Sequence, residues 1–311
     1  MEEKNTYELA IIGAGPAGLS ASVYASRFGI KHVVFGGLMG GTISEAHIVD
    51  NYLGIEDMSG MELSQNFIKH AKKYGTEIIS DAVKKIEKKA DDSFEIFFNG
   101  DKKMFVKTVL LATGTKRKKI GIKGEEEFSG KGVSYCATCD GFFYKNKIVG
   151  VVGGANSAVS AAVYLAEIAQ KVYLIYRKDK LPAEEYWTKL LAKNKKIETL
   201  YNLNVVEIVG EKKIEKVKLD GMYDGKSEIA LDGLFIECGS DPRADFTVDL
   251  GTEKDKGGFI KIQKDGATSA LGVWAAGDIT DGSNKFSQVI TAASEGAIAT
   301  KGIYNYLRKN K

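Results

Sequence analysis

The residues best suited to chemistry are two cysteines three positions apart, Cys136 and Cys139, and the aspartate that follows them, Asp140. Cysteines at this spacing can close a small disulfide, and a C-x-x-C arrangement can lower the pKa of a thiol well below its usual value of about 8.5. A thiolate exchanges with another disulfide through a mixed disulfide. The stretch 134–141 therefore predicts dithiol redox chemistry.

Asp140 has two possible roles. If it lies partly buried among Phe142, Phe143 and Tyr144, its carboxyl group can hold a proton near neutral pH and act as acid and base for a thiol. The alternative is a turn position, because Gly141 follows directly.

A zinc site is the alternative role for the two cysteines. Zinc takes about four ligands in proteins. The other candidate ligands are scattered along the chain: Cys238, His32, His47 and His70. Cys238 also belongs to an apolar stretch, residues 234–239, which indicates a core position. We therefore expect no metal.

A glycine-rich loop, Gly13-Ala14-Gly15-Pro16-Ala17-Gly18, separates an apolar stretch (7–12) from a predicted helix (19–28). A second apolar stretch follows at 30–35. In this strand–loop–helix–strand context, G-x-G-x-x-G predicts a dinucleotide site, because glycine lets the backbone and the helix N-terminus approach a pyrophosphate. A packing turn is the alternative. The second strand ends at Gly36-Gly37, without the acidic residue that usually binds the adenosine ribose.

The same pattern recurs later in the chain. The loop Gly153-Gly154-Ala155-Asn156-Ser157-Ala158 lies between a predicted strand (148–152) and a predicted helix (158–168), and another strand is expected at 172–176. The sequence thus repeats one nucleotide-binding unit. Its second copy carries Ala155 where the pattern has its middle glycine, the residue that lets a pyrophosphate approach.

The remaining segments surround these two units. Helices are expected at 61–74, 185–193 and 289–307, and strands at 109–113, 259–262 and 273–276. Alternating apolar and charged residues predict an antiparallel insertion at 76–110, and short strands at 203–237 with turns at 220–221 and 224–225. The part after residue 239 looks too small to fold alone, so we expect it to complete the first domain.

Length and composition favour a cytoplasmic enzyme of two domains. The chain has 311 residues, 44% hydrophobic, with a net charge of +3 and mixed signs, which does not support nucleic-acid binding. No apolar run reaches the roughly 18 residues of a membrane helix. The acidic start lacks a signal-peptide core, and three cysteines cannot form a disulfide framework.

Four features together resemble the low-molecular-weight thioredoxin reductases: the first glycine loop, Ala112-Thr113-Gly114, Cys136-Ala137-Thr138-Cys139-Asp140, and Ala276-Gly277-Asp278 followed by Gln288-Val289. The resemblance covers almost the whole chain. It implies an α/β fold of two Rossmann-like, three-layer domains, the second inserted into the first. Residues 1–115 and 240–311 would bind FAD, and residues 116–239 would bind NAD(P)H and carry the cysteines. It also implies a homodimer that reduces thioredoxin or a glutaredoxin-like redox protein.

The resemblance also implies roles for individual residues. Cys136 would attack the disulfide of the partner, Cys139 would face the flavin, and Asp140 would transfer the proton. Asp278 would bind the ribityl chain. The implied FAD site consists of Gly13, Gly15, Pro16, Ala17, Gly18, Gly41, Asn51, Val83, Thr113, Gly114, Gly277, Asp278, Gln288 and Val289. The implied NAD(P)H site consists of Gly153, Gly154, Ala155, Asn156, Ser157, Ala158, Arg177 and Lys178.

The chain departs from the family pattern at the NAD(P)H site. Besides Ala155, it has Tyr176-Arg177-Lys178 where the family has His-Arg-Arg, and Pro182 where a further arginine is usual. Arg177 and Lys178 still attract a 2′-phosphate, so NADPH is favoured over NADH. The alternatives are a ferredoxin or deazaflavin donor in place of both, and a redox-sensing protein without turnover.

Overall fold

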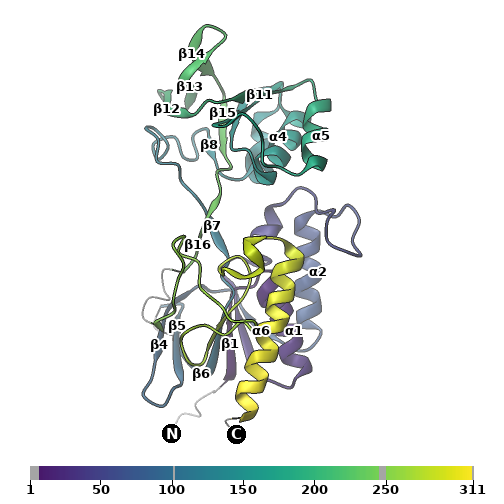
Figure 1. Cartoon of the computed structure of the whole chain (residues 1–311), viewed down its shortest axis with the longest axis vertical. Helices are drawn as coiled ribbons and strands as arrows, with labels where there is room; N and C mark the ends of the chain where they lie inside the picture. The colour runs from purple at the N-terminus through teal and green to yellow at the C-terminus, as the bar shows by residue number, and fades with distance from the viewer. Residues whose placement is uncertain (1–6, 101, 245–249, 310–311) are drawn as a thin grey trace. The chain divides into compact units, whose positions relative to one another are not determined.

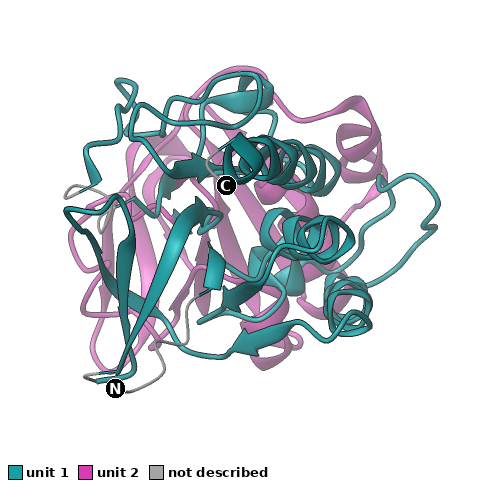
Figure 2. Cartoon of the chain, turned by 90° about the horizontal axis from the view of Figure 1, so that it is seen from below, with its two compact units in different colours: residues 1–116, 241–311 teal, residues 117–240 magenta. Residues whose placement is uncertain are grey.

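The computed structural model describes residues 7–100, 102–244 and 250–309. The chain divides into two compact units, unit 1 (Met1–Lys116 and Asp241–Lys311) and unit 2 (Arg117–Ser240), coloured separately in Figure 2. The two chain segments that link the units pair as a short sheet of β7 (Thr115–Arg117) and β16 (Ser240–Pro242). Unit 2 is thus inserted into the sequence of unit 1.

Unit 1 is built on a seven-stranded sheet with the order β3-β2-β1-β6-β5-β4, in which β17 also pairs with β6. Its strands are β1 (Tyr7–Ile12), β2 (His32–Phe35), β3 (Glu77–Ile79), β4 (Val83–Lys88), β5 (Phe94–Phe98), β6 (Lys102–Leu111) and β17 (Val273–Ala275). The long β6 is antiparallel to β5 along its first half and parallel to β1 and β17 along its second half. The antiparallel insertion expected at 76–110 is therefore continuous with the parallel sheet, and β3 pairs with β2 in parallel.

The helices of unit 1 are α1 (Pro16–Arg27), α2 (Gly60–Lys72) and α6 (Val289–Lys309), with the short 3₁₀ turns η1 (Gly41–Glu45) and η4 (Gly282–Lys285). Figure 1 shows α6 alongside α1. Their contact is close, because a Cβ at Gly296 would lie 2.0 Å from the carbonyl oxygen of Ala17. The segment after residue 240 thus completes unit 1, with β17 beside β6 and α6 beside α1.

Unit 2 has a five-stranded parallel sheet with the order β11-β10-β9-β15-β8. Its strands are β8 (Val133–Ser134), β9 (Ile148–Val152), β10 (Lys171–Tyr176), β11 (Ile197–Tyr201) and β15 (Gly233–Ile236). A separate antiparallel sheet contains β12 (Val205–Gly210), β13 (Ile214–Tyr223) and β14 (Lys226–Ala230). The helices are α3 (Ala137–Asp140), α4 (Asn156–Ile168) and α5 (Glu185–Lys193), with the 3₁₀ turn η2 (Gly141–Tyr144). Both units contain the expected strand–loop–helix–strand arrangement of a Rossmann fold.

Two local predictions are wrong. Asp220 and Gly221 lie inside β13 and form no turn, because Asp220 accepts hydrogen bonds from the neighbouring Asn204 and the pattern of buried residues continues through Leu219. Residues 259–262 form no strand. Ile260 is fully buried, but makes only isolated bridges to Lys254 and Thr280.

Candidate functional site

The Cys136–Cys139 disulfide lies directly after β8, at the start of α3. The disulfide is closed, with 5.3 Å between the two Cα atoms. Cys136 is the N-cap residue of α3, and its Sγ accepts a hydrogen bond of 3.2 Å from the backbone N–H of Cys139. Cys136 is half-buried and Cys139 is exposed. The pair can therefore exchange electrons with groups from outside unit 2, and the N–H on Sγ favours the thiolate form of Cys136 after reduction.

A serine connects this pair to its acidic neighbour. The hydroxyl group of Ser134, buried at the end of β8, donates to Oδ2 of Asp140 at 2.6 Å. The same hydroxyl accepts the backbone N–H of Cys136 at 3.1 Å. Ser134 thus holds the Asp140 carboxylate beside the disulfide. The sequence alone does not identify Ser134 as a functional residue, because its hydroxyl group contacts Asp140 only after the chain has turned through α3.

The aromatic residues after Asp140 do not enclose it as expected. Phe142 and Phe143 are 74% and 68% exposed, so they do not cover Asp140, which is nevertheless half-buried. Only Tyr144 turns inward, where its ring packs edge-on against Phe235 with 5.3 Å between the centroids. Burial, and then the nearby charge of Asp140, raise the pKa of the Tyr144 phenol.

The first glycine loop forms a close-packed cradle in unit 1. A Cβ at Gly13 would lie 2.1 Å from the carbonyl oxygen of Ala112, and one at Gly18 would lie 1.8 Å from that of Gly13. Gly15 faces Gly41, where an added Cβ would lie 2.9 Å from the Cα of Gly15. Two glycine loops therefore meet at the N-terminus of α1. The cradle has the bare backbone and the uncapped helix start that a pyrophosphate requires.

Other predicted FAD residues gather around the same end of unit 1. A Cβ at Gly277 would lie 2.9 Å from Cβ of Ala17, next to Pro16 at the start of α1. Asn51 donates from Nδ2 to Oε1 of Gln288 at 3.0 Å, beside Val289 at the start of α6. The fold thus brings together the glycine loop, the 38–54 loop and the start of α6.

The remaining predicted FAD residues flank this cradle. Thr113 and Gly114 follow β6, and the Thr113 hydroxyl donates to the carbonyl of Arg243 at 2.8 Å. Val83 opens β4, and its neighbour Ala82 lies against Gly37 at the end of β2. The place expected for the adenosine ribose is therefore bordered by backbone and small apolar side chains.

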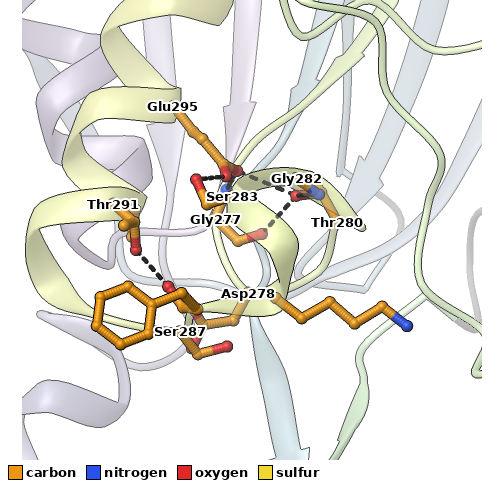
Figure 3. A pocket seen from close by; sticks show the side chains of 11 residues that line it. Gly277, Asp278, Thr280, Gly282, Ser283, Ser287, Thr291 and Glu295 are labelled. Carbon is orange, nitrogen blue, oxygen red and sulfur yellow. Dashed lines mark hydrogen bonds between the residues drawn. The ribbon is translucent and has the colours of Figure 1, made fainter.

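A carboxylate pair lies where the chain leaves β17. Asp278 lines a pocket together with Glu295 from α6 (Figure 3). Burial, and then the charge of Glu295, raise the pKa of Asp278 to about 6. Glu295 was not predicted from the sequence, because a glutamate inside a helix resembles any solvated surface residue until its partners are known.

The second glycine loop is also closely packed. A Cβ at Gly153 would lie 2.3 Å from the carbonyl oxygen of Glu237, and the ring of Tyr176 lies against Gly154, 2.4 Å from an added Cβ. Ala155 has an ordinary extended backbone, with φ −83° and ψ −179°, so nothing in its own conformation requires glycine. The Ala155 methyl group therefore causes no backbone strain, and it can hinder only a ligand that approaches this backbone.

The rest of the predicted NAD(P)H site is polar and open. Asn156, the first residue of α4, exchanges two hydrogen bonds of 2.8 Å with Glu184. Ser157 follows it, and Ala158 is buried. Arg177 and Lys178 extend beyond the end of β10 and are exposed, as is Pro182. This arrangement leaves two cations near the expected 2′-phosphate and no arginine at position 182.

Within residues 7–100, 102–244 and 250–309, no group of three or more His, Cys, Asp or Glu side chains is arranged to hold a metal ion. None of the described helices is both long and apolar enough to span a membrane. Cys238 is half-buried, and its Sγ donates to the carbonyl of Val152 at 3.2 Å, as a core thiol would.

Comparison with known proteins identifies the family. The model of the pyridine nucleotide-disulphide oxidoreductases matches residues 7–296. The thioredoxin reductase of Bacillus subtilis (strain 168) is 38% identical over 312 residues, which cover 99% of this chain and 97% of the relative. The solved thioredoxin reductase of Lactococcus lactis is 35% identical with a TM-score of 0.92, covering 97% of this chain and 99% of that one. A ferredoxin-flavin thioredoxin reductase from Clostridium acetobutylicum is 34% identical with a TM-score of 0.53, covering 98% and 99%. These similarities confirm the resemblance seen in the sequence: the chain belongs to the pyridine nucleotide-disulphide oxidoreductase family and, within it, to the thioredoxin reductases.

Proposed function

We propose that the chain is a flavin-dependent thioredoxin-disulfide reductase. Electrons pass from a reduced donor to FAD, then to the Cys136–Cys139 disulfide, and finally to the disulfide of thioredoxin or a similar small redox protein. The observation that carries this proposal is the closed disulfide with the Asp140 carboxylate held beside it by Ser134. The names of the relatives support thioredoxin as the partner.

Unit 1 is the proposed FAD site. Its residues fit the group, because Gly13 and Gly18 let the loop pack closely against the backbone at Ala112, and Gly15 leaves bare backbone at the uncapped start of α1, where a pyrophosphate would lie. Asp278 would bind the ribityl hydroxyl groups. Asn51 and Gln288 would contact the ring system from the two segments that their hydrogen bond joins.

Thiol chemistry completes the reaction. FAD, when bound, would supply two electrons from the donor, which with two protons convert the disulfide to two thiols. The Cys136 thiolate then attacks the partner's disulfide and breaks its S–S bond. Cys139 next attacks the mixed disulfide, so the Cys136–Cys139 bond re-forms and the partner leaves as a dithiol. Asp140 holds and transfers the thiol proton during these steps.

NADPH bound to unit 2 is the proposed electron donor. The exposed cations Arg177 and Lys178 at the end of β10 favour a 2′-phosphate. NADH is the weaker alternative, because the end of this strand carries no acidic residue for a ribose 2′-hydroxyl group. The Ala155 methyl group would weaken the binding of either dinucleotide, and the absence of an arginine at position 182 would weaken the binding of NADPH.

A donor other than a dinucleotide is the second candidate. Ala155 places a methyl group on the loop on which a pyrophosphate would lie, and the Tyr176 ring packs against the neighbouring Gly154. One relative with 34% identity is named a ferredoxin-flavin thioredoxin reductase. A ferredoxin or a deazaflavin would then reduce FAD directly.

Anaerobic reduction of the purified flavoprotein shows whether NADPH, NADH or reduced ferredoxin is the electron donor. NADPH, NADH and reduced ferredoxin are added separately, and the loss of oxidised-flavin absorbance is followed with time. Rapid bleaching by NADPH supports the leading proposal and excludes the second candidate. Bleaching by ferredoxin alone supports the second. Protein that retains no flavin and reduces no disulfide with any donor would instead indicate a redox-sensing role.

The assembly and the compartment belong to the same proposal. We expect a homodimer, which light scattering of the full chain would detect. A cytoplasmic location is consistent with only three cysteines, because a close pair of cysteines in a reducing compartment is usually catalytic and not structural.

A further inference from the structure

One carboxylate makes three hydrogen bonds to the turn that leads from β17 to α6. Glu295, in the second turn of α6, accepts the backbone N–H of Gly277 at 2.8 Å through Oε2. The same oxygen accepts the Thr280 hydroxyl group at 3.0 Å, and Oε1 accepts the Ser283 hydroxyl group at 2.6 Å (Figure 3). Glu295 thus contacts the turn at three points, over residues 277–283.

This turn has a backbone that needs such support. Ser283, Asn284 and Lys285 are consecutive non-glycine residues with φ of 48°, 53° and 58°. Left-handed backbone is uncommon for residues with a side chain, and three in succession persist only when their surroundings fix them. The Ser283 bond to Glu295 fixes the first of them, and the ion pair of Lys285 with Asp255 at 2.5 Å fixes the last.

The turn carries a carboxylate that lines a pocket, Asp278. Asp278 follows Gly277 directly and lines the same pocket as Glu295. Among the residues that the structure describes, no hydrogen-bond donor to the Asp278 carboxylate is found, although burial and Glu295 raise its pKa to about 6. A partly buried carboxyl group without a donor is suited to accept hydroxyl groups of a bound molecule.

We propose that Glu295 is a positioning residue for FAD: it fixes the Gly277–Ser283 turn so that Asp278 presents its carboxylate to the ribityl hydroxyl groups. This inference rests on the proposed FAD site of unit 1. The geometry favours it because the same carboxylate joins the end of β17, which carries Asp278, to α6, whose start carries Gln288 and Val289. Glu295 thereby connects the two segments that form the two sides of the proposed flavin site.

Titration of the flavin-stripped full chain with FAD tests this role, with binding measured by the quenching of flavin fluorescence. Glu295→Ala removes three hydrogen bonds, and we expect FAD to bind about 10- to 100-fold more weakly. Glu295→Gln keeps an acceptor for Gly277 and Thr280 and offers its amide N–H to the Ser283 oxygen, so binding should return to within about threefold of the wild type. Ser294→Ala, at the exposed neighbouring position on α6, is the matched control and should bind FAD as the wild type does.

Each outcome of the FAD titration supports or contradicts the positioning role of Glu295. Wild-type affinity in Glu295→Ala would overturn the positioning role. A loss in Glu295→Gln as large as in Glu295→Ala would also overturn it, because the charge and not the bonds would then matter. If Glu295→Ala does not fold, Ser283→Ala removes one bond, and we expect FAD binding about 3- to 10-fold weaker; unchanged binding would contradict the proposal. A wild-type chain that binds no FAD would instead refute the proposed function.

Discussion

Asn51 and Gln288 are 237 positions apart in the sequence, yet the Nδ2 of Asn51 donates to the Oε1 of Gln288 at 3.0 Å. The bond joins the loop that follows β2 to the residue that precedes α6. Both residues belong to the FAD site that the family resemblance implies. Their contact therefore closes one side of the proposed flavin site using two segments that the sequence keeps far apart.

We expect Asn51→Ala and Gln288→Ala each to weaken FAD binding several-fold, because each removes the hydrogen bond and leaves its partner to reorient. A double-mutant cycle on the FAD dissociation constant should give a coupling of about 0.5–1.5 kcal/mol. Leu53→Ala is the control, since that side chain is 88% exposed in the same loop. Strictly additive losses would show that the contact does not contribute to FAD binding.

Replacing Ser134 should impair the thiol steps and leave flavin reduction unchanged. Ser134→Ala removes the 2.6 Å bond that holds Asp140 beside the disulfide, so thioredoxin reduction should slow about tenfold. Stopped-flow absorbance separates reduction of the flavin by its donor from the later oxidation of the dithiol. In combination with Asp140→Asn the effects should not add, because both changes act through one carboxylate. Full additivity would contradict this link.

Single-cysteine variants assign the attacking thiol. Cys139→Ser should trap a stable mixed disulfide between Cys136 and thioredoxin, detectable by mass under non-reducing conditions, because the resolving thiol is absent. Cys136→Ser should trap much less, although Cys139 is the more exposed residue, since the hydrogen bond from the Cys139 N–H to the Cys136 sulfur favours a thiolate at Cys136. A greater yield from Cys136→Ser would reverse the two roles.

The contribution of Asp278 to the stability of the flavin-free protein should become less favourable as the pH rises from about 4 to about 7. Asp278 has a pKa of about 6 in the folded chain, against roughly 3.9 when unfolded, so between these values the folded state keeps a proton that the unfolded state has lost. The charged carboxylate then costs at most about 3 kcal/mol above pH 7, and almost nothing below about pH 3, where both states are protonated. Asp278→Asn should therefore raise the melting temperature more at pH 7.5 than at pH 4.5, while weakening FAD binding at pH 7.5. An equal rise in melting temperature at both pH values would contradict the assignment.

The sequence by itself determined the redox centre and the plan of the two units. A C-x-x-C-D stretch and glycine loops between a strand and a helix are local patterns, and their chemistry follows from neighbouring residues in the chain. The helix at 185–193 and the strand at 148–152 were predicted with the bounds that the structure gives them. Helix α1 begins three residues earlier than predicted, because Pro16 suits the first position of a helix.

Only the tertiary structure decided how the sites are supported. Ser134 reaches Asp140 after a turn of helix, Glu295 reaches Gly277 across 18 positions, and Asn51 reaches Gln288 across 237. It also exposed Phe142 and Phe143, which the sequence pattern had suggested as a cover for Asp140. Hydrogen bonds of this kind depend on where the folded backbone brings each side chain, and no spacing along the chain encodes that position. The sequence thus determined which groups react, and the fold determined which residues hold them in place.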